Sequence, residues 1–468
     1  IEANAAMSKH PANQTDHNHF DRPGMAHADA SANRFNLTRR DCLRIGAATA
    51  WSLGAGSSGT LDSLFDGASR AAAADTPSRE IAPKSVAAVV TVYHRNSHAD
   101  VILGKIMDGW EQDAGPGPAL KLAAVYIDQF PDSDIGRETC KKHGVPIFDS
   151  IEKAITVGGD RVPVDGVLCI GEHGNYPLND IGQQLYPRRK FFEQITDTFR
   201  KYDRVVPVFN DKHIGPVWSD AKWTYDRARE MNVPFMAGSS LPVGYRTNDI
   251  DLPMASDIES AVGIGYSGLE IYGIHALEFY QYHIERRRGG ERGVKSVQFL
   301  QGAEMWRAVD SGLISTAAFE AALAVVPKSV KPNVGPDDVR NDRDAGLFLF
   351  EYVDGFVGAV FMLSCIGGTA IGLKMKNRAQ PIATAFDERT TPRFPHFAYL
   401  LKAIERMIHN GQPTYPVERT LLTSGILDRV MNSRAQSGKR MITPELEIAY
   451  QPVDYPHAPH IDVRKPPI

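Results

Sequence analysis

The chain has 468 residues, of which 43% are hydrophobic and 23% are charged. This is an ordinary globular composition in a chain too long for one compact core, so two domains are expected. The formal net charge of −4 and the lack of a basic stripe interleaved with aromatic residues argue against nucleic acid as a partner. The four cysteines have neither C-x-x-C pairing nor regular spacing, which predicts free thiols rather than disulfides or a zinc knuckle.

The first part of the chain has the pattern of an export leader. Residues 1–37 are polar and rich in Ala, Asn and His, which predicts disorder. Over 38–74, the pair Arg39-Arg40 precedes a weakly apolar run and an alanine cluster at 71–74, the order typical of a twin-arginine (Tat) signal. We therefore expect recognition by the Tat export machinery and a periplasmic or other extracytoplasmic location.

After a linker over 75–84, residues 85–243 alternate short β-branched runs with longer amphipathic segments, as in the βαβ units of a parallel sheet. Ligands of such sheets bind beyond the carboxyl ends of the strands, so the loops that begin at Tyr93, Asp128, Gly171 and Asn210 are the candidate binding loops. The predicted strands are 86–92, 121–127, 164–170, 205–209 and 233–237, and the predicted helices are 99–110, 133–143, 190–199 and 218–231.

Residues 244–450 form the predicted second domain, whose apolar runs alternate like strands of an antiparallel sheet. We expect 293–299 to be its first strand. The further predicted strands are 347–352, 356–363, 369–376 and 381–387, and the predicted helices are 305–314, 316–324 and 397–409. The proline-rich end, 451–468, is expected to lie extended on the surface or on a neighbouring subunit.

Three segments in the expected order resemble motifs of the Gfo/Idh/MocA oxidoreductases. The string Val208-Phe209-Asn210-Asp211-Lys212-His213 is similar to the Glu-Lys-Pro strand end, and Gly273-Ile274-His275-Ala276-Leu277-Glu278 to the Asp-x-Gly-x-His helix. The stretch from Tyr415 to Leu422, with Thr443-Pro444 beyond it, resembles the closing segment.

This resemblance implies the α/β class: a Rossmann-like parallel-sheet domain, then an α+β domain with an open, mostly antiparallel sheet that forms a homo-oligomer. It implies NAD or NADP and hydride transfer with a small carbohydrate or cyclitol, and it makes Lys212 and His275 the catalytic residues. Lysine can stabilise a developing alkoxide, and imidazole can accept a proton.

The first βα turn departs from the family because Tyr93 to Ala99 contains no glycine, although glycine normally allows the backbone to approach a pyrophosphate. We therefore expect the turn to exclude a dinucleotide in the usual pose. The candidate cofactor residues are Arg95, Asn96 and Ser97, which begin a helix that can still receive an anion, and Asp128, which ends the second strand.

Histidines and acids accumulate at the strand ends and raise the possibility of a divalent metal. Neutral imidazoles with carboxylates such as Glu172 and Asp211 suit zinc, iron or manganese. The candidate metal ligands are His94, His98, His173 and His213, and the candidate substrate residues in the loop after the third strand are Glu172, His173, Asn175 and Tyr176.

Three classes of function stay open at this point. The first is a nicotinamide-dependent sugar or cyclitol oxidoreductase. The second is a metal-dependent or cofactor-free carbohydrate lyase, hydratase or isomerase, favoured by the missing glycines and the added histidines. The third is a carbohydrate-binding protein without catalytic activity, which needs only a cleft with polar groups.

Overall fold

The computed structural model describes residues 82–250, 252–266, 268–327 and 334–459. The predicted disordered segment and the Tat signal lie outside the described residues. Within the described residues, the three cysteines Cys140, Cys169 and Cys365 are all free thiols. No helix in the described part of the chain is both long enough and apolar enough to cross a membrane.

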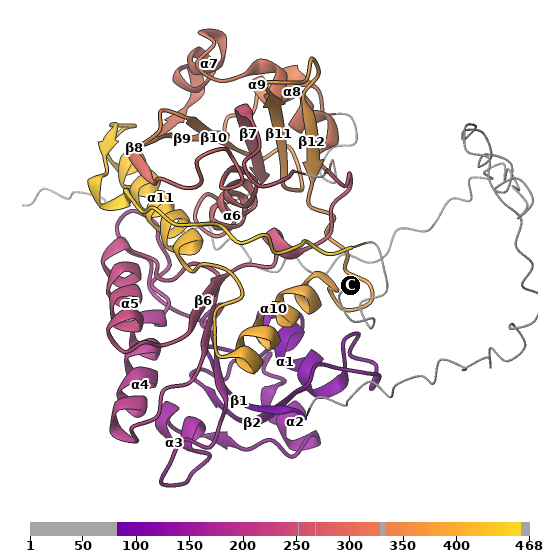
Figure 1. Ribbon diagram of the computed structural model, residues 1–468, viewed down its shortest axis with the longest axis vertical. Coiled ribbons are helices and arrows are strands. Elements are labelled where there is room, and N and C mark those ends of the chain that lie inside the picture. Colours follow the sequence, from indigo (N-terminus) through magenta and orange to yellow (C-terminus); the bar gives the residue numbers. More distant parts are fainter. Residues whose placement is uncertain (1–81, 251, 267, 328–333, 460–468) are drawn as a thin grey trace, which may run out of the picture. The chain divides into compact units, whose positions relative to one another are not determined.

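The first sheet has six parallel strands in the order β3-β2-β1-β4-β5-β6 (Figure 1). Its strands are β1 Lys84–Val90, β2 Leu120–Ile127, β3 Ile147–Phe148, β4 Gly166–Ile170, β5 Val208–Asp211 and β6 Phe235–Gly238. The helices that connect them are α1 His98–Asp108, α2 Gly136–Lys142, α3 Ile151–Thr156, α4 Arg188–Lys201 and α5 Trp218–Glu230. This doubly wound arrangement confirms the predicted Rossmann-like parallel sheet, with β3 and α3 as elements that the prediction omitted.

The central residues of these strands are mostly apolar, as expected where helices cover both faces of a sheet. In β1, Val86, Ala88 and Val90 pack in one core with α1, whereas Ala87 and Val89 face the other core. Both sets are fully buried.

The second sheet has seven strands in the order β12-β11-β7-β10-β9-β8-β13, all antiparallel to their neighbours except the β7–β10 pair. Its strands are β7 Ile258–Tyr266, β8 Val294–Gln301, β9 Gly346–Tyr352, β10 Val357–Leu363, β11 Ala370–Met375, β12 Ile382–Ala385 and β13 Met441–Ile442. The helices of this half are α6 Gly273–Ile284, α7 Gly302–Asp310, α8 Thr316–Val325, α9 Pro336–Arg340, α10 His396–Asn410 and α11 Glu418–Ala435. Short 3-10 turns lie at Leu241–Val243 and Pro444–Leu446.

The prediction that 293–299 begins this sheet is wrong, because β7 precedes it. Gly263 and Gly265 both lie inside β7. A Cβ atom at Gly265 would lie 2.6 Å from Cβ of Ala276, and one at Gly263 would lie 3.0 Å from the Tyr280 ring. The glycines therefore let α6 pack directly onto the strand.

Helix α10 packs on the first domain, although its residues lie within the range 244–450 that we predicted for the second domain. Figure 1 shows α10 beside α1, and its residues Leu400, Leu401 and Ile404 share a core with Val101 of α1. The chain therefore crosses back over the parallel sheet before it continues into α11, which packs on α6 and β8.

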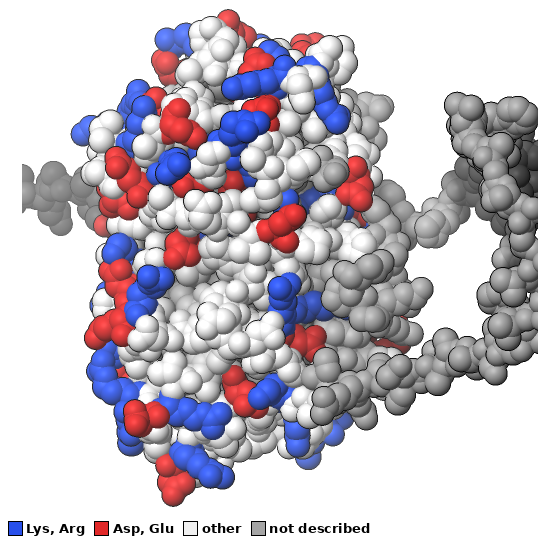
Figure 2. Space-filling model, viewed as in Figure 1, with Lys and Arg blue, Asp and Glu red and all other residues white. Residues whose placement is uncertain are grey.

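The described part of the C-terminal segment lies extended along this chain. The Ala458 amide donates to the Val243 carbonyl at 2.8 Å, and Asp454 pairs with Arg286 at 2.8 Å. On the molecular face in Figure 2, positive and negative side chains are interspersed, so that face has no broad patch of one sign.

Candidate active site

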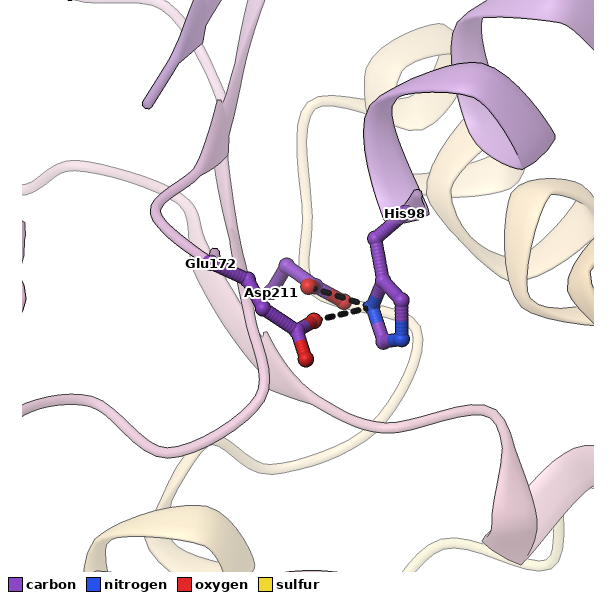
Figure 3. A group of neighbouring side chains, drawn as sticks. All are labelled: His98, Glu172 and Asp211. Atoms are coloured by element: carbon purple, nitrogen blue, oxygen red, sulfur yellow. Dashed lines mark hydrogen bonds and ion pairs between the residues drawn. The ribbon is translucent and has the colours of Figure 1, made fainter. Parts of the chain in front are cut away.

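Three adjacent strand ends bring an imidazole and two carboxylates together. His98 is the first residue of α1, just after β1, whereas Glu172 follows β4 and Asp211 ends β5. The His98 Nδ1 atom lies 2.8 Å from Glu172 Oε2 and 2.7 Å from Asp211 Oδ2 (Figure 3). Since β1, β4 and β5 are neighbours in the sheet, their order alone places these groups at one edge.

Lys212 completes what we call the charged cluster: His98, Glu172, Asp211 and Lys212. Its ammonium group forms an ion pair with Glu172 Oε1, and its side chain is 7% exposed. Lys212 has φ 62° and His173 has φ 64°, both in the left-handed region that side chains rarely adopt. The backbone is thus strained directly after each of the two carboxylates, as is common at functional sites.

The charges of the cluster are balanced. Burial opposes protonation of His98, but Asp211 and Glu172 outweigh it and raise the pKa of His98 to about 9. Burial also opposes ionisation of Glu172, yet His98 and Lys212 hold its pKa well below the ordinary value. Two carboxylates therefore face one imidazolium and one ammonium, which compensates for their removal from water.

The second predicted catalytic residue, His275, lies beside this cluster. It is in the first turn of α6, and its ring centroid is 6.5 Å from that of His98. Burial and the Lys212 charge lower the pKa of His275 well below its ordinary value, so its ring is neutral near pH 7. Its Nδ1 atom is buried and has no hydrogen-bond partner among the described residues.

His213, a predicted metal ligand, faces another group. Its Nε2 atom lies 2.9 Å from the guanidinium of Arg188 and 3.6 Å from Glu270. Burial and the Arg188 charge lower the pKa of His213 well below its ordinary value, and burial raises the pKa of Glu270. Arg188 is fully buried, and its Nε and Nη2 atoms have no partner within the described chain.

The predicted metal ligands His94 and His173 lie next to the cluster but outside the group of converging donor atoms. Their rings are 4.9 Å apart, and the His173 ring is 6.2 Å from that of His98. Burial lowers the pKa of His173 to about 4, against the attraction of Glu172. Of the four predicted histidines, only His98 belongs to a group with metal-ligand spacing, and its partners there are Glu172 and Asp211.

The predicted substrate residues separate in the structure. Glu172 is in the charged cluster, whereas the backbone of Asn175 is bound by the Gln129 side chain and is near the surface. The Tyr176 hydroxyl donates to Asp128 at 2.7 Å, and the Tyr126 hydroxyl donates to its other oxygen at 2.6 Å. Both carboxylate oxygens of Asp128, a predicted cofactor residue, therefore already accept hydrogen bonds within the protein.

The predicted phosphate-binding turn is also occupied by contacts of this chain. The Asn96 amide donates to the Asp100 carboxylate at 2.8 Å, and Ser97 caps α1 by accepting from the Asp100 amide at 3.3 Å. The Arg393 guanidinium donates to Asn96 Oδ1 at 2.8 Å, to Asp100 Oδ2 at 2.6 Å and to Gln112 Oε1 at 2.8 Å. Arg95 is exposed.

The first turn of α1 therefore does not fit a dinucleotide in the usual pose. A pyrophosphate there needs glycine and free amides, but this turn has side chains throughout, and the Asp100 carboxylate already lies at the helix start. Lys105, which donates to the Arg393 carbonyl at 2.6 Å, holds the covering loop in place.

Two important arginines could not be found from the sequence. Arg393 is almost 300 positions away from the turn that it covers and is part of no motif. Arg188 is in an Arg-Arg-Lys run that resembles a solvated helix start, yet it is fully buried. Asp211 was indicated only by its position at the carboxyl end of β5, because ligands of parallel sheets bind beyond the strand ends.

Comparison with solved structures identifies the fold. The chain is similar to a structure of GenD2 from gentamicin A biosynthesis in complex with NAD, with 12% identity and a TM-score of 0.50, over 77% of this chain and 97% of that one. A probable dehydrogenase from Thermotoga maritima (12%, TM-score 0.49, 77% and 99%) and an apo scyllo-inositol dehydrogenase from Lactobacillus casei (10%, TM-score 0.48, 77% and 98%) are also similar. No family model and no curated protein matches the sequence. The two-domain fold expected from the Gfo/Idh/MocA resemblance is confirmed.

Proposed function

We propose that the protein is an enzyme that transfers a proton on a sugar or cyclitol at the charged cluster, as a lyase, hydratase or isomerase does. The observation that carries this proposal is the convergence of Lys212 and His275, from different domains, on one buried group of balanced charges. Buried ionised groups of this kind are costly to maintain and are typical of catalytic sites.

Each residue has a role that its surroundings support. The Lys212 ammonium stabilises negative charge that develops on a substrate oxygen, an effect that is strong where water is excluded. His275 is neutral near pH 7, so its imidazole can accept a substrate proton. Glu172 holds the Lys212 side chain toward the same place.

The misfit of the dinucleotide at α1 favours proton transfer over hydride transfer. A hydride needs an acceptor, and the side chains over the first turn of α1 occupy the position where the phosphates of a nicotinamide cofactor would bind. A proton needs only a base and a group that stabilises the resulting charge. The class of substrate rests on the fold, whose similar structures include an inositol dehydrogenase.

A nicotinamide-dependent sugar or cyclitol oxidoreductase is the second candidate. Its support is the fold, which is shared with an NAD complex, and the position of Lys212 and His275, which the oxidoreductase motifs predicted. This candidate requires NAD or NADP to bind in a pose that leaves the Arg393 contacts intact.

The experiment is a screen of aldoses, ketoses, cyclitols and their keto derivatives, incubated with the protein in D2O without nucleotide and followed by NMR. We expect deuterium at a carbon next to a carbonyl, or loss or gain of water, with at least one compound. Lys212→Met should lose this conversion. Lys222→Met is its matched control, because Lys222 is exposed on α5 and forms an ion pair with Asp226. Saturable binding of sugars without any conversion would instead favour a binding protein and contradict the proposal.

A further inference from the structure

The donor atoms of His98, Glu172 and Asp211 form a set that suits a cation as well as a proton. One imidazole nitrogen and one oxygen from each carboxylate all lie within 4.8 Å of one another. Each side chain comes from a different element, and the exposed fractions of the three side chains are 15%, 5% and 0%. The three groups are therefore held by the fold itself.

The distances between these donors match neighbouring ligands of one ion. Two cis ligands with bonds of about 2.1 Å to an octahedral ion lie about 3 Å apart. The corresponding distances from His98 Nδ1 are 2.7 Å to Asp211 and 2.8 Å to Glu172. The third pair, the two carboxylate oxygens, also lies within 4.8 Å.

A second observation is an unsatisfied oxygen in the same group. Asp211 is fully buried, and its Oδ1 atom has no hydrogen-bond partner among the described residues. A buried carboxylate oxygen without a hydrogen-bond partner is costly, and binding a cation would compensate for this cost. Figure 3 shows the two carboxylates directed at the same edge of the His98 ring.

We propose that His98 Nδ1, Glu172 and Asp211 bind one divalent first-row transition-metal ion, such as Mn²⁺, Fe²⁺ or Zn²⁺. Imidazole with carboxylates suits these ions, and no thiolate takes part. The ion replaces the proton between His98 and the carboxylates, and Lys212 remains as a neighbouring charge on Glu172. Because the ion would polarise a substrate oxygen at this site, the inference deepens, and rests on, the proposed function.

The test measures metal binding without any substrate. The full chain is stripped with a chelator and titrated with Mn²⁺, Zn²⁺ and Co²⁺ alone, followed by metal analysis and by the visible absorption of bound Co²⁺. We expect one ion per chain in the wild type. Asp211→Asn and Glu172→Gln should each weaken binding at least tenfold and change the Co²⁺ spectrum.

The controls separate this site from other metal-binding groups. Asp165→Asn should bind as the wild type does, because Asp165 lies at the opposite end of the same sheet, beside Lys84 and Ser85. Histidines outside the site, including those of the leader, are the same in every variant, so binding that they provide is unchanged by Asp211→Asn. Thermal melting identifies a variant that fails to fold, in which case Glu172→Gln decides.

The possible results distinguish this inference from the proposed function. Equal binding in the wild type, Asp211→Asn and Glu172→Gln, or no binding in the wild type, overturns the metal site. Proton transfer by chelator-stripped protein overturns the role of the ion in polarising a substrate oxygen and leaves the proposed function intact. One ion bound at these residues, with no sugar or cyclitol converted, supports the metal site and contradicts the proposed function.

Discussion

Lys212 is charged and His275 is neutral, and these two states suit different tasks. Lys212 is a cation held by Glu172, whereas burial and that same cation keep His275 neutral. A cation beside a neutral base can stabilise an oxyanion while the base removes the proton. The strained backbone at Lys212 indicates that its side-chain position is imposed by the surrounding structure.

Replacing either residue should abolish conversion with little effect on the fold. We expect Lys212→Met and His275→Ala each to reduce kcat at least 100-fold, and the double variant to be little worse than either single one, because residues that act together are not additive. Steady-state kinetics with a converted substrate, alongside thermal melting, measures both quantities. Normal turnover in either single variant would remove this pair from the mechanism.

Glu278 provides a pH test of a buried carboxyl group outside the cluster. Burial raises its pKa to about 7, although the Ser239 amide and the Thr420 hydroxyl donate to it at 2.5 and 2.7 Å. A raised pKa in the folded state means that stability is fully present below the unfolded pKa near 4.5 and is lost as the pH rises through 7. The expected loss is about 3 kcal/mol.

Glu278→Gln should remove most of this loss of stability, because an amide does not ionise. Its amide oxygen can still accept the hydrogen bond from the Ser239 amide. Denaturant unfolding at pH 5 and pH 8 compares the two proteins. The stability of the wild type should fall relative to the variant between these pH values. An equal pH dependence in both proteins would show that Glu278 ionises at its ordinary pKa in the folded state.

The charged cluster was only partly predictable. Motif order identified Lys212 and His275, and the strand-end rule selected the loops that contain His98 and Glu172. The rule could not show that His98 faces the two carboxylates while His213 turns to Arg188, because side-chain direction depends on packing with distant elements. Arg393 is also far in the sequence from the turn that it contacts, so no local sequence pattern predicts these contacts.

At the scale of elements, the start of α1 determines which cofactor can bind. Its turn has no glycine, its Asn96 amide is used by Asp100, and Arg393 binds across it. We expect calorimetric titration of ligand-free protein with NAD and NADP to show weak binding or none. Submicromolar binding of either nucleotide would contradict the conclusion that this turn excludes a dinucleotide.

Element prediction succeeded where periodicity was clear and failed where other constraints applied. The strands of the first sheet other than β3 were found within a few residues of their bounds, because apolar runs flanked by helices are typical of a parallel sheet. β7 was missed because its glycines serve close packing. α11 was missed because it is buried around most of its surface and polar residues such as Arg419, Thr423 and Asp428 are among the buried ones, so its sequence lacks an amphipathic period.

At the scale of the molecule, both faces of the second sheet are covered. α6 and α11 pack on one face, and α8, with α7, packs on the other through Phe319, Met305 and Phe361. The resemblance implies oligomers formed through this sheet. A homo-oligomer stays a prediction.

We propose that the protein is exported by the Tat machinery, on the evidence of Arg39-Arg40 and the alanine cluster at 71–74. Export of a folded protein suits a site assembled from both domains before translocation. Replacing both arginines with lysine should leave the protein in the cytoplasm, as cell fractionation would measure. Normal export of this variant would contradict the proposal.

The fate of the substrate hydrogen tests the central claim most directly. A sugar or cyclitol that the protein converts is labelled with deuterium at the reacting carbon and incubated in ordinary water with NAD present. Proton transfer at the charged cluster predicts that the deuterium appears in water and that conversion is the same without NAD. Deuterium recovered on the nicotinamide ring would contradict the account and establish hydride transfer instead.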